Sequence, residues 1–440
     1  MSGRHSIWRG LAVVFATVAL TIAFVVMALL VGPDTQALIV RAVVVSLIIF
    51  VSFLFLRYFA LLWFAYLQHS ERSIMGVPEL DRLPAVSVLV PAYNEGPLLE
   101  RALTSLMLLD YPEYEVLVID DGSRDDTLRL AAEWEGQRGT GEFRVITKSN
   151  GGKASALNAG IAHSKHPLVF CMDADSYLEP QTLRRAARHF ADPAVGAVAG
   201  NVKVENRNSL ITRLQALEYI EGLNMPRRAQ GFVAAVNIVP GPVGMFRREA
   251  LEEVGGYDAD TFAEDADLTL KMMEAGWRVL YEDAAIAWSE APERWIDLVQ
   301  QRYRWTRGIL QAIRKRKGIL LRPFPDFPLW VSTLQLGFEA LVWPAMNVFA
   351  HLFFAIVALL FGAGELILYW IVLLTLLDLV AALVTVSMEE ESLSLVPMAL
   401  IYRFVFILFL DVVKMFATVE ELFRLEMGWG KLQRVAHAVP

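Results

Sequence analysis

The sequence predicts a Rossmann-like α/β domain with a mostly parallel sheet, inserted between transmembrane helices. Of the 440 residues, 55% are hydrophobic, and the mean hydropathy of +0.42 is high for a wholly soluble chain. Apolar stretches long enough to cross a bilayer lie towards both ends. Between them, short apolar runs alternate with amphipathic segments, which indicates strands joined by helices and therefore parallel strands with right-handed crossovers.

Composition excludes several classes of function. The formal net charge is −8, so the basic signature of nucleic-acid binding is missing and no nucleic-acid partner is expected. The sequence has one cysteine, Cys171, and seven histidines without metal-ligand spacing. These counts exclude an internal disulfide and a cysteine-based zinc site. Cys171 lies in an apolar run, where a small buried thiol is expected.

Two transmembrane helices are predicted at the amino end. Residues 11–31 are apolar and uncharged over a length that spans a bilayer, whereas a signal peptide would have a shorter apolar core and a small-residue cleavage site. A second span is predicted over 37–56, with Arg41 and Arg57 at its ends, where their charged heads can reach the interface. The positive flanks place the start of the chain, and the domain after this helical hairpin, on the cytoplasmic side.

The α/β alternation begins near residue 83. Apolar runs of strand length predict strands, and apolar residues at helical spacing predict helices. Polar turns follow the second, third and fourth strands, which is the layout of a ligand site along the carboxyl ends of a parallel sheet. The predicted strands are 86–91, 115–119, 143–146, 168–172, 195–204 and 277–281, and the predicted helices are 98–109, 126–135, 210–223, 264–275 and 295–320. The helix at 210–223 could lie in a membrane interface or pack on the sheet. In the last helix, Arg302 and Arg307 could equally be membrane anchors.

Two groups of carboxylates stand out. Asp173 and Asp175 end the fourth strand, where alternate residues point to the same face and open α/β sheets bind ligands. Two hard oxygen ligands at this spacing can hold Mg²⁺ or Mn²⁺ against a diphosphate. Glu264, Asp265 and Asp267 crowd the first turn of a helix. The helix dipole favours acids there, yet three acids are more than a cap needs.

The carboxyl third predicts further membrane helices. Spans are predicted over 342–361, 366–386 and 397–417, and 329–341 is expected either to be interfacial or to contribute to a span. Three spans would leave the basic tail outside, against the positive-inside tendency. Charged residues in or near the last span indicate a polar lumen or a partner helix. They are Arg403, Asp411 and Lys414.

Six short motifs follow one another along the chain. They are Pro91-Ala-Tyr-Asn-Glu95, Asp120-Asp-Gly-Ser123, Gly152-Lys-Ala-Ser-Ala-Leu-Asn158, Asp173-Ala-Asp175, Glu264-Asp265 and Gln301-Arg-Tyr-Arg-Trp305. Together they resemble the processive family 2 glycosyltransferases of GT-A fold, the membrane synthases of cellulose, chitin, hyaluronan and poly-β-N-acetylglucosamine. The resemblance covers about residues 84–320 and extends to the flanking membrane segments. The Gln-x-x-Arg-Trp motif is the most specific, because most single-transfer relatives lack it.

The resemblance implies roles on the donor side of a transfer reaction. Asp120 or Asp121 would hydrogen-bond the uracil, and Lys153 would lie near the diphosphate. Asp173 and Asp175 would hold Mg²⁺ or Mn²⁺ with the diphosphate and the donor sugar. The implied nucleotide-sugar residues are Ala92, Tyr93, Glu95, Asp120, Asp121, Lys153 and Asp173.

On the acceptor side, the resemblance implies Asp265 as the general base, beside Glu264. Arg304 would meet the diphosphate, and Trp305, in the motif that begins at Gln301, would floor the acceptor-sugar site. An inverting transfer needs one base for the acceptor hydroxyl and a cation for the departing UDP, not the carboxylate arrangement of a retaining hydrolase. Interfacial anchoring is the alternative for Trp305. The family usually has Thr-Glu-Asp where this chain has Ala-Glu-Asp, so any contact of that threonine with the growing chain is in doubt.

These observations predict five regions and one function. The regions are two transmembrane helices (1–69), a cytoplasmic GT-A domain (80–290), amphipathic interface helices with the Gln-x-x-Arg-Trp motif (291–328), carboxyl transmembrane helices (329–420) and a short amphipathic tail (421–440). The function is inverting, processive transfer from a UDP-sugar to a growing β-linked polysaccharide, with passage of the polymer across the cytoplasmic (inner) membrane. Segments 195–200 and 244–251 resemble poly-N-acetylglucosamine synthases and favour UDP-GlcNAc.

Three alternatives stay open. The segment Gly308-Ile-Leu-Gln311 also resembles cellulose synthases, so a β-glucan synthase using UDP-glucose is the first. A single-transfer enzyme acting on a lipid carrier is the second, and a non-enzymatic membrane transporter or scaffold is the third. Because about five helices are few for a complete channel, a small membrane subunit or a homodimer is an expected partner, in addition to membrane lipid.

Overall fold

The structure is a computed structural model that describes residues 38–75, 82–324, 326–361 and 364–424. The first predicted span, 11–31, lies outside these residues. The described chain has an α/β domain with long apolar helices before and after it in the sequence, as the sequence predicts.

A nine-stranded mixed sheet forms the centre of the domain, in the order β3-β4-β2-β1-β5-β8-β7-β9-β6. Strands β4, β2, β1 and β5 are parallel to one another, and β7 is parallel to β9. Strand β8 runs antiparallel between β5 and β7, and the edge strands β3 and β6 are also antiparallel to their neighbours. The strands are β1 (Val86–Ala92), β2 (Tyr114–Asp120), β3 (Gly136–Arg138), β4 (Gly141–Thr147), β5 (Leu168–Cys171), β6 (Ser176–Leu178), β7 (Val195–Val204), β8 (Gly244–Arg247) and β9 (Arg278–Ser289).

All six predicted strands occur. Strand β9 is longer than predicted, because it continues past Tyr281 to pair with β7 as far as Val204 and with β6. The sequence does not predict β3, β6 and β8, which have three or four residues each. Strands of that length are too short for a periodic apolar pattern to develop.

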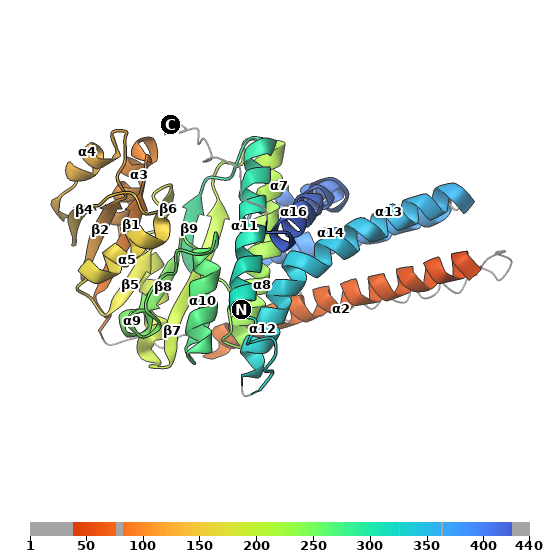
Figure 1. The fold of residues 1–440 in the computed structure, drawn as a ribbon, viewed down its shortest axis with the longest axis horizontal. Coiled ribbons are helices and arrows are strands. Elements are labelled where there is room, and N and C mark those ends of the chain that lie inside the picture. Colours follow the sequence, from red (N-terminus) through yellow and green to blue (C-terminus); the bar gives the residue numbers. More distant parts are fainter. Residues whose placement is uncertain (1–37, 76–81, 325, 362–363, 425–440) are drawn as a thin grey trace.

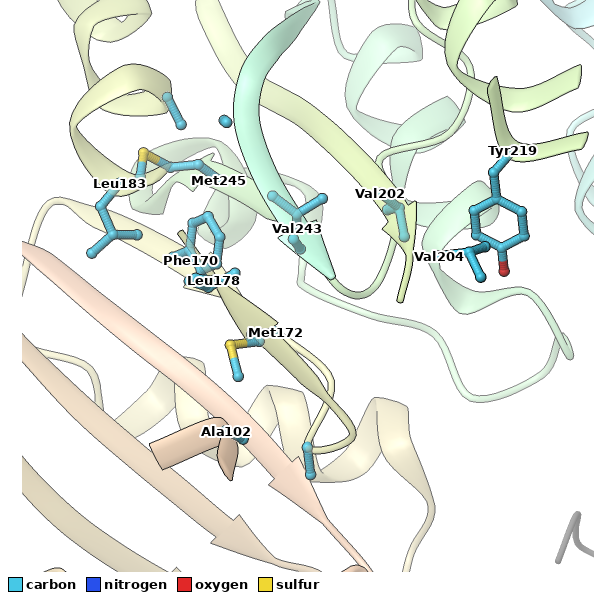
Figure 2. Close-up of a cluster of buried hydrophobic side chains, with 14 of the residues drawn as sticks. Ala102, Phe170, Met172, Leu178, Leu183, Val202, Val204, Tyr219, Val243 and Met245 are labelled. Atoms are coloured by element: carbon cyan, nitrogen blue, oxygen red, sulfur yellow. The ribbon is translucent and has the colours of Figure 1, made fainter. Parts of the chain in front are cut away.

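The central strands are buried on both faces, and their alternate residues fill two layers of core. In β1, Val86 and Val90 belong to one layer and Leu89 to the other. Figure 2 shows part of the first layer, in which Phe170 and Met245 from neighbouring antiparallel strands lie together. Strands covered on both sides have continuous apolar runs, which is why the sequence reveals them.

Helices cover both faces of this sheet. The predicted helix 210–223 is α7, which passes through a π-turn (Tyr219–Asn224) into α8. Its Leu214 and Leu217 are buried in the core cluster next to the sheet, so α7 packs on the sheet, and it also contacts the turn Leu393–Met398. The helices of the domain are α3 (Gly96–Met107), α4 (Thr127–Ala132), α5 (Lys153–His163), α6 (Thr182–Ala187), α7 (Leu210–Glu218), α8 (Met225–Phe232), α9 (Arg248–Val254), α10 (Glu264–Glu274) and α11 (Trp295–Lys315).

Long apolar helices extend away from the domain. Figure 1 shows α2 and α13 pointing away from the sheet, with α7, α8 and α11 between the sheet and these helices. Three segments of the described chain are long and apolar enough to cross a membrane, namely Ile48–Ser70, Ile367–Met388 and Leu393–Leu422. The helices outside the domain are α2 (Leu38–Met75), α12 (Phe327–Gly337), α13 (Trp343–Phe361), α14 (Gly364–Met388), α15 (Ala399–Ile401) and α16 (Leu408–Leu422).

The described part of the second predicted span, 37–56, lies in helix α2. Helix α2 continues beyond Leu56 through Arg57 to Met75, and a candidate span within it is Ile48–Ser70. The sequence interpretation placed Arg57 at the interface, but its guanidinium pairs with Glu339 at 2.5 Å. The charge is therefore compensated inside the helix bundle. Helix α12 continues into α13 through the π-turn Phe338–Val342. Residues 329–341, which were expected to be interfacial or part of a span, therefore belong to a long helix.

The last apolar segment, Leu393–Leu422, is not straight. Its first half is a 3₁₀ turn containing Pro397, followed by one turn of α-helix and a π-turn. In the π-turn, Arg403 pairs with Asp378 of α14 at 2.7 Å and donates to the hydroxyl of Tyr58 on α2 at 2.9 Å. The partner helices expected for this charge are thus present in the chain itself.

A buried ion-pair network joins the loop after α14 to the domain. Glu389 accepts from Arg228 Nη2 at 2.8 Å and from Asn201 Nδ2 at 2.5 Å. Glu391 pairs with Arg207 at 2.6 Å. Arg228 is only 2% exposed, so its charge depends on carboxylate partners in place of water. Removing Glu389 would leave Arg228 with Asp283, at 2.6 Å, as a remaining carboxylate partner, and the loss of one partner of a buried charge costs far more than an exposed pair gains.

We expect Glu389→Ala to destabilise the protein by about 3 kcal/mol, because it removes a carboxylate from the buried Arg228. The measurement is the apparent melting temperature of the detergent-solubilised chain. The matched control is Glu252→Ala, which removes the more exposed pair with Arg248 and should cost less than about 0.5 kcal/mol. Equal melting temperatures for the two variants would contradict this prediction.

Candidate active site

A pocket of about 540 Å³ lies between the carboxyl edge of the sheet, the start of α10 and the helix α11. It brings together eight residues that the sequence analysis singled out. They are Lys153, Asp173, Asp175, Glu264, Asp265, Gln301, Arg304 and Trp305. These residues come from four separate parts of the chain, so the sheet edge and the helices build the pocket jointly.

The sequence analysis expected the two carboxylates after β5 to lie at the end of the strand itself. In the structure they lie in a turn. Strand β5 ends at Cys171, and the Ser176 N–H donates to the Asp173 carbonyl at 3.1 Å, which closes a turn before β6. The side chains of Asp173 and Asp175 both line the pocket. They reach one space through this turn and not through strand alternation. Hard carboxylate oxygens of this kind suit Mg²⁺ or Mn²⁺.

Lys153 begins α5 and lies among the acids of the pocket. Its ammonium is 2.5 Å from Asp173 and 3.4 Å from Glu264. Burial alone would lower the pKa of Lys153, but these carboxylates outweigh it and the pKa is raised. A Cβ on Gly241 would lie 2.6 Å from the lysine Nζ and 3.1 Å from an Asp173 oxygen. The backbone at Gly241 therefore closes over the charged pair, at a place where a side chain would displace it.

Glu264 and Asp265 form the first turn of α10, as predicted. Burial and the charge of Glu264 raise the pKa of Asp265 to about 6, although Lys153 and the N–H of Ala266 act in the opposite direction. The N–H of Ala266 donates to Asp265 Oδ1 at 2.8 Å and holds the side chain at the helix start. A carboxyl group with a pKa this close to neutrality is suited to accept a proton.

Helix α11 presents Gln301, Arg304 and Trp305 to the pocket. Arg302, the residue between them, is 2% exposed and donates to both oxygens of Glu218 at 3.1 and 2.6 Å. It also donates to Gln301 Oε1 at 2.6 Å and stacks over the Trp305 ring at 4.2 Å. The membrane-anchor alternative for Arg302 is therefore wrong, since this guanidinium is buried in the protein. Arg304 is exposed and makes no hydrogen bond or ion pair with the described residues.

The residues expected around the uracil lie apart from this pocket, at the carboxyl ends of β1 and β2. Ala92 and Asp120 are in register there, beside Thr147 of β4. Asp120 is buried and accepts from Thr147 Oγ1 at 3.1 Å and from the Ser123 N–H at 3.2 Å. The expected residues that do not line the pocket are Ala92, Tyr93, Glu95, Asp120 and Asp121.

Asp121 organises the glycine loop that leads into α5. Its carboxylate accepts from the N–H groups of Gly151 and Gly152 at 3.0 and 2.7 Å and from Lys148 Nζ at 2.7 Å. The loop ends at Lys153, the first residue of α5. Asp121 consequently sets the position of Lys153, a structural contribution that the motif itself does not reveal.

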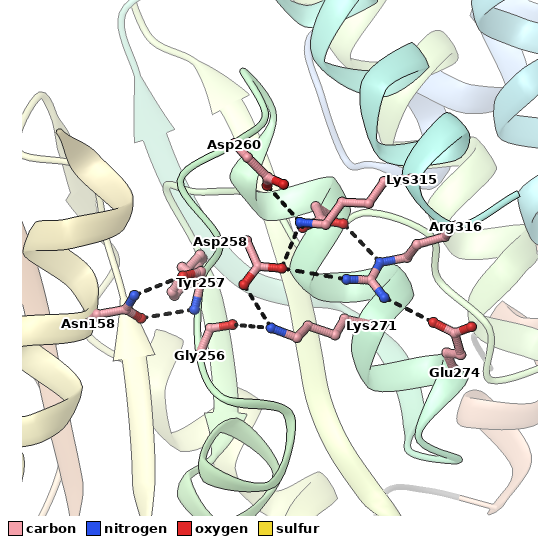
Figure 3. A network of polar contacts seen from close by, with 10 residues as sticks. Asn158, Gly256, Tyr257, Asp258, Asp260, Lys271, Glu274, Lys315 and Arg316 are labelled. Atoms are coloured by element: carbon pink, nitrogen blue, oxygen red, sulfur yellow. Dashed lines mark hydrogen bonds and ion pairs between the residues drawn. The ribbon is translucent and has the colours of Figure 1, made fainter.

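A further acidic group lies outside the pocket. Carboxylate oxygens of Asp258, Asp260 and Asp267 lie within 4.8 Å of one another, a grouping that could hold a metal ion. Lys315 Nζ takes this place, at 2.7, 2.6 and 2.9 Å from the three carboxylates, and Figure 3 shows Lys271 joining the network. Burial alone would raise the pKa of Asp258, but the hydrogen bonds from Lys315 and Lys271 lower it to about 2. The group is thus an ion-pair network between α11 and the region of α10.

Several pocket residues gave no usable signal in the sequence. Arg227 of α8 is buried and lines the pocket, and its burial lowers its pKa, yet its charge marks it as a surface residue of an amphipathic helix. A charged run follows β9 and also faces the pocket. The rule that identified Asp173 would have found this run if the strand had been predicted to its true end. Its lining residues are Glu290, Glu293, Arg294 and Asp297.

Fold and pocket together define a GT-A glycosyltransferase domain. A mannosyltransferase from Pyrobaculum calidifontis, solved in complex with GDP-mannose and Mn²⁺, has this fold, with a TM-score of 0.60 and 23% identity over 83% of this chain and 96% of that one. The chain belongs to glycosyltransferase-like family 2, whose profile matches residues 84–308.

Relatives in sequence are poly-β-1,6-N-acetyl-D-glucosamine synthases. The synthase of Staphylococcus epidermidis is 31% identical over 240 residues, which cover 54% of this chain and 58% of the relative. That of Staphylococcus aureus is 30% identical over 283 residues, which cover 62% of this chain and 66% of the relative. The similarity therefore spans less than two thirds of either relative.

Proposed function

We propose that the chain is an inverting glycosyltransferase that polymerises N-acetylglucosamine from UDP-GlcNAc and passes the polymer across the inner membrane. The observation that carries this proposal is the pocket in which Asp265, with its raised pKa, faces a carboxylate pair, the exposed guanidinium of Arg304 and a tryptophan. Inverting transfer requires a base for the acceptor hydroxyl and positive charge at the leaving group.

On the donor side, Asp173 and Asp175 would hold Mg²⁺ or Mn²⁺. When bound, the ion supplies positive charge for the departing diphosphate. Lys153 lies beside this pair, and Arg304 has no competing ion pair in the described part of the chain, so its guanidinium can donate two parallel hydrogen bonds to phosphate oxygens. The uracil would lie near the ends of β1 and β2, beside Asp120.

On the acceptor side, Asp265 would accept the proton of the sugar hydroxyl. The hydroxyl oxygen then bonds to the anomeric carbon while the bond from that carbon to UDP breaks. Glu264 contributes by keeping the pKa of Asp265 high enough for this step. Trp305 offers a flat apolar face to the acceptor ring, and Gln301, held by Arg302, offers an amide to its hydroxyls.

A second cavity supports passage of a polymer. Its volume is about 210 Å³, and it continues from the pocket into the helix bundle, lined by Tyr58, Trp343 and Tyr402 among others. Glu221 also lines it, and neither of its buried carboxylate oxygens has a hydrogen bond in the part of the chain described. Burial and the nearby Asp378 raise the pKa of Glu221 well above its ordinary value. A polymer rich in hydroxyl groups would satisfy this carboxyl group. The residues shared by both cavities are Leu223, Arg227, Ile238, Trp305 and Ile309.

Our choice of donor sugar rests on the relatives, and our choice of partners rests on the exposed surface of the helices. The relatives are named for N-acetylglucosamine polymerisation, which favours UDP-GlcNAc over UDP-glucose, and the second cavity favours a polymer over a single transfer. Membrane lipid would cover apolar side chains exposed on α2 and α14, such as Ile49 and Leu368. A small membrane subunit or a second copy of the chain would complete the helix bundle.

Membranes that contain the chain should incorporate sugar from UDP-GlcNAc, with Mg²⁺ or Mn²⁺, into long polymer, and far less from UDP-glucose or UDP-glucuronate. Asp265→Asn should lower incorporation at least about 100-fold, because the general base is lost. The same substitution at Asp260, which lies outside the pocket lining, is the control and should leave it unchanged. A short lipid-linked product would favour a single-transfer enzyme, and full activity of Asp265→Asn would rule out its role as base.

The transfer rate should fall as the pH drops below about 6, because protonated Asp265 can no longer accept a proton. Glu264→Gln removes the neighbouring negative charge that helps to raise this pKa, so the acid limb should move to lower pH. Initial rates at saturating donor concentration, measured from about pH 5 to about pH 8, give the acid limb of the unaltered chain and that of the variant. An acid limb that stays in place in Glu264→Gln would refute the coupling between the two carboxyl groups.

We infer a cytoplasmic domain, with the start of α14 on the opposite side of the membrane. Cys171 is the single cysteine and is buried, so cysteines introduced at exposed sites can be labelled selectively. In intact cells, a membrane-impermeant maleimide should label Glu365→Cys in the exposed first turn of α14. Gln137→Cys on the domain should react only after the cells are opened, and the unchanged chain gives the blank. The reverse pattern would place the domain outside.

A further inference from the structure

The segment Leu393–Leu422 is long and apolar enough to cross a membrane, yet it contacts the domain at both ends. Just before its start, Glu391 pairs with Arg207 at 2.6 Å. At its other end, Glu421 pairs with Arg307 of α11 at 3.0 Å. A straight span would separate its ends by about 30 Å of hydrocarbon. In this structure the first half of the segment contains a 3₁₀ turn and a π-turn, and α16 lies against α11.

Helix α16 packs lengthwise along α11, on the side away from the pocket. Near the start of α11, the rings of Trp295 and Phe409 meet edge to face with centroids 5.0 Å apart. Further along, Tyr303 and Val413 belong to one apolar cluster. Residues three or four apart share a helix face. The α11 residues that contact α16 include Trp295, Val299, Tyr303, Arg307, Gln311 and Arg314, and those that line the pocket are Asp297, Gln301, Arg304, Trp305 and Ile309.

Glu421 is the buried charged contact between these two helices, next to Glu420, whose carboxylate lies 4.0 Å from Arg307. Glu421 is 4% exposed; its carboxylate accepts from Arg307 at 3.0 Å and Gln311 at 2.9 Å and pairs with Arg314 at 2.8 Å. Arg307 is also 4% exposed, so it is a buried partner of Glu421 and not the membrane anchor that the sequence allowed. Without this carboxylate, the buried Arg307 would lose its nearest compensating charge.

Gln311 connects the same carboxylate to the loop that precedes the proposed base. Its side-chain N–H donates to Glu421 Oε2 at 2.9 Å, and its side-chain oxygen accepts from the Phe262 N–H at 3.1 Å. Phe262 lines the pocket, three residues before Asp265. A single amide, fixed at both ends, therefore joins α16 to the segment that carries Asp265.

We propose that Glu421 is a positioning residue for the transfer reaction. Through Arg307 and Gln311 it fixes both the helix that presents Trp305 to the acceptor and the loop that presents Asp265. The proposal rests on the proposed function, and it assigns to α16 a part in chemistry that takes place on the other side of α11. Disturbing Glu421 should consequently alter the catalytic step, while the sheet edge expected to hold the uracil stays intact.

The test compares Glu421→Gln with Glu391→Gln, in the full chain and in membranes supplied with UDP-GlcNAc. The control removes the carboxylate of Glu391, beside the other end of the segment, which pairs with Lys203 of β7 and with Arg207. We expect Glu421→Gln to lower kcat about tenfold or more, as a small misplacement of reacting groups does. UDP affinity, measured by direct titration, should be unchanged, and Glu391→Gln should keep its kcat. Combining Glu421→Gln with Gln311→Glu exchanges the amide and the carboxylate, and this double variant should recover kcat.

Wild-type kcat in Glu421→Gln, or an equal loss in Glu391→Gln, would overturn the proposal, because either result would reduce Glu421 to a general anchor. If Glu421→Gln does not accumulate in membranes, Gln311→Ala carries the same test, since Gln311 is uncharged and half-buried. These results concern this inference alone. An unaltered chain that binds UDP but makes no polymer would overturn the proposed function and this inference together.

Discussion

Buried guanidinium groups on α11 require carboxylate partners, and this requirement determines where the helix can lie. Glu218 holds Arg302 from the domain, and Glu421 holds Arg307 from α16. Any shift of α11 would leave one of these cations without its partner in a place that water does not reach. The helix that lines the pocket is thus fixed by paired charges on two sides, and these pairs also set the position of Trp305.

The same helix is also held close to the proposed base. A Cβ on Gly308 would lie 2.4 Å from the N of Ala263 and 2.6 Å from its Cβ, so α11 and the loop before α10 meet nearly backbone to backbone. Ala263, which makes this contact, stands at the position where the processive family 2 glycosyltransferases usually have threonine. The alanine of this chain and the glycine facing it let the two elements approach, and Lys315 fastens the end of α11 to the same region through Asp258.

Sequence reasoning succeeded where a pattern is local. Apolar runs revealed the central strands, and an acid following a strand revealed Asp173, because both depend on neighbouring residues alone. It failed where partners are distant in the chain. Arg302 could have been a membrane anchor until Glu218 was seen beside it, and Asp121 serves the glycine loop through contacts about thirty residues away. Sequence reasoning also missed the 3₁₀ and π-turns after Ser392, because these turns leave the apolar composition of a span unchanged.

The ion pair between Arg57 and Glu339 has a consequence for how the chain is made. The two residues are 282 positions apart, and the whole α/β domain lies between them. A chain synthesised from its amino end therefore exposes Arg57 on α2 long before Glu339 exists. An arginine at the centre of a lone membrane helix costs about 2.5–3.5 kcal/mol. In a bilayer, α2 would carry an uncompensated charge during that interval, and its final placement would wait for the arrival of the carboxyl-terminal helices.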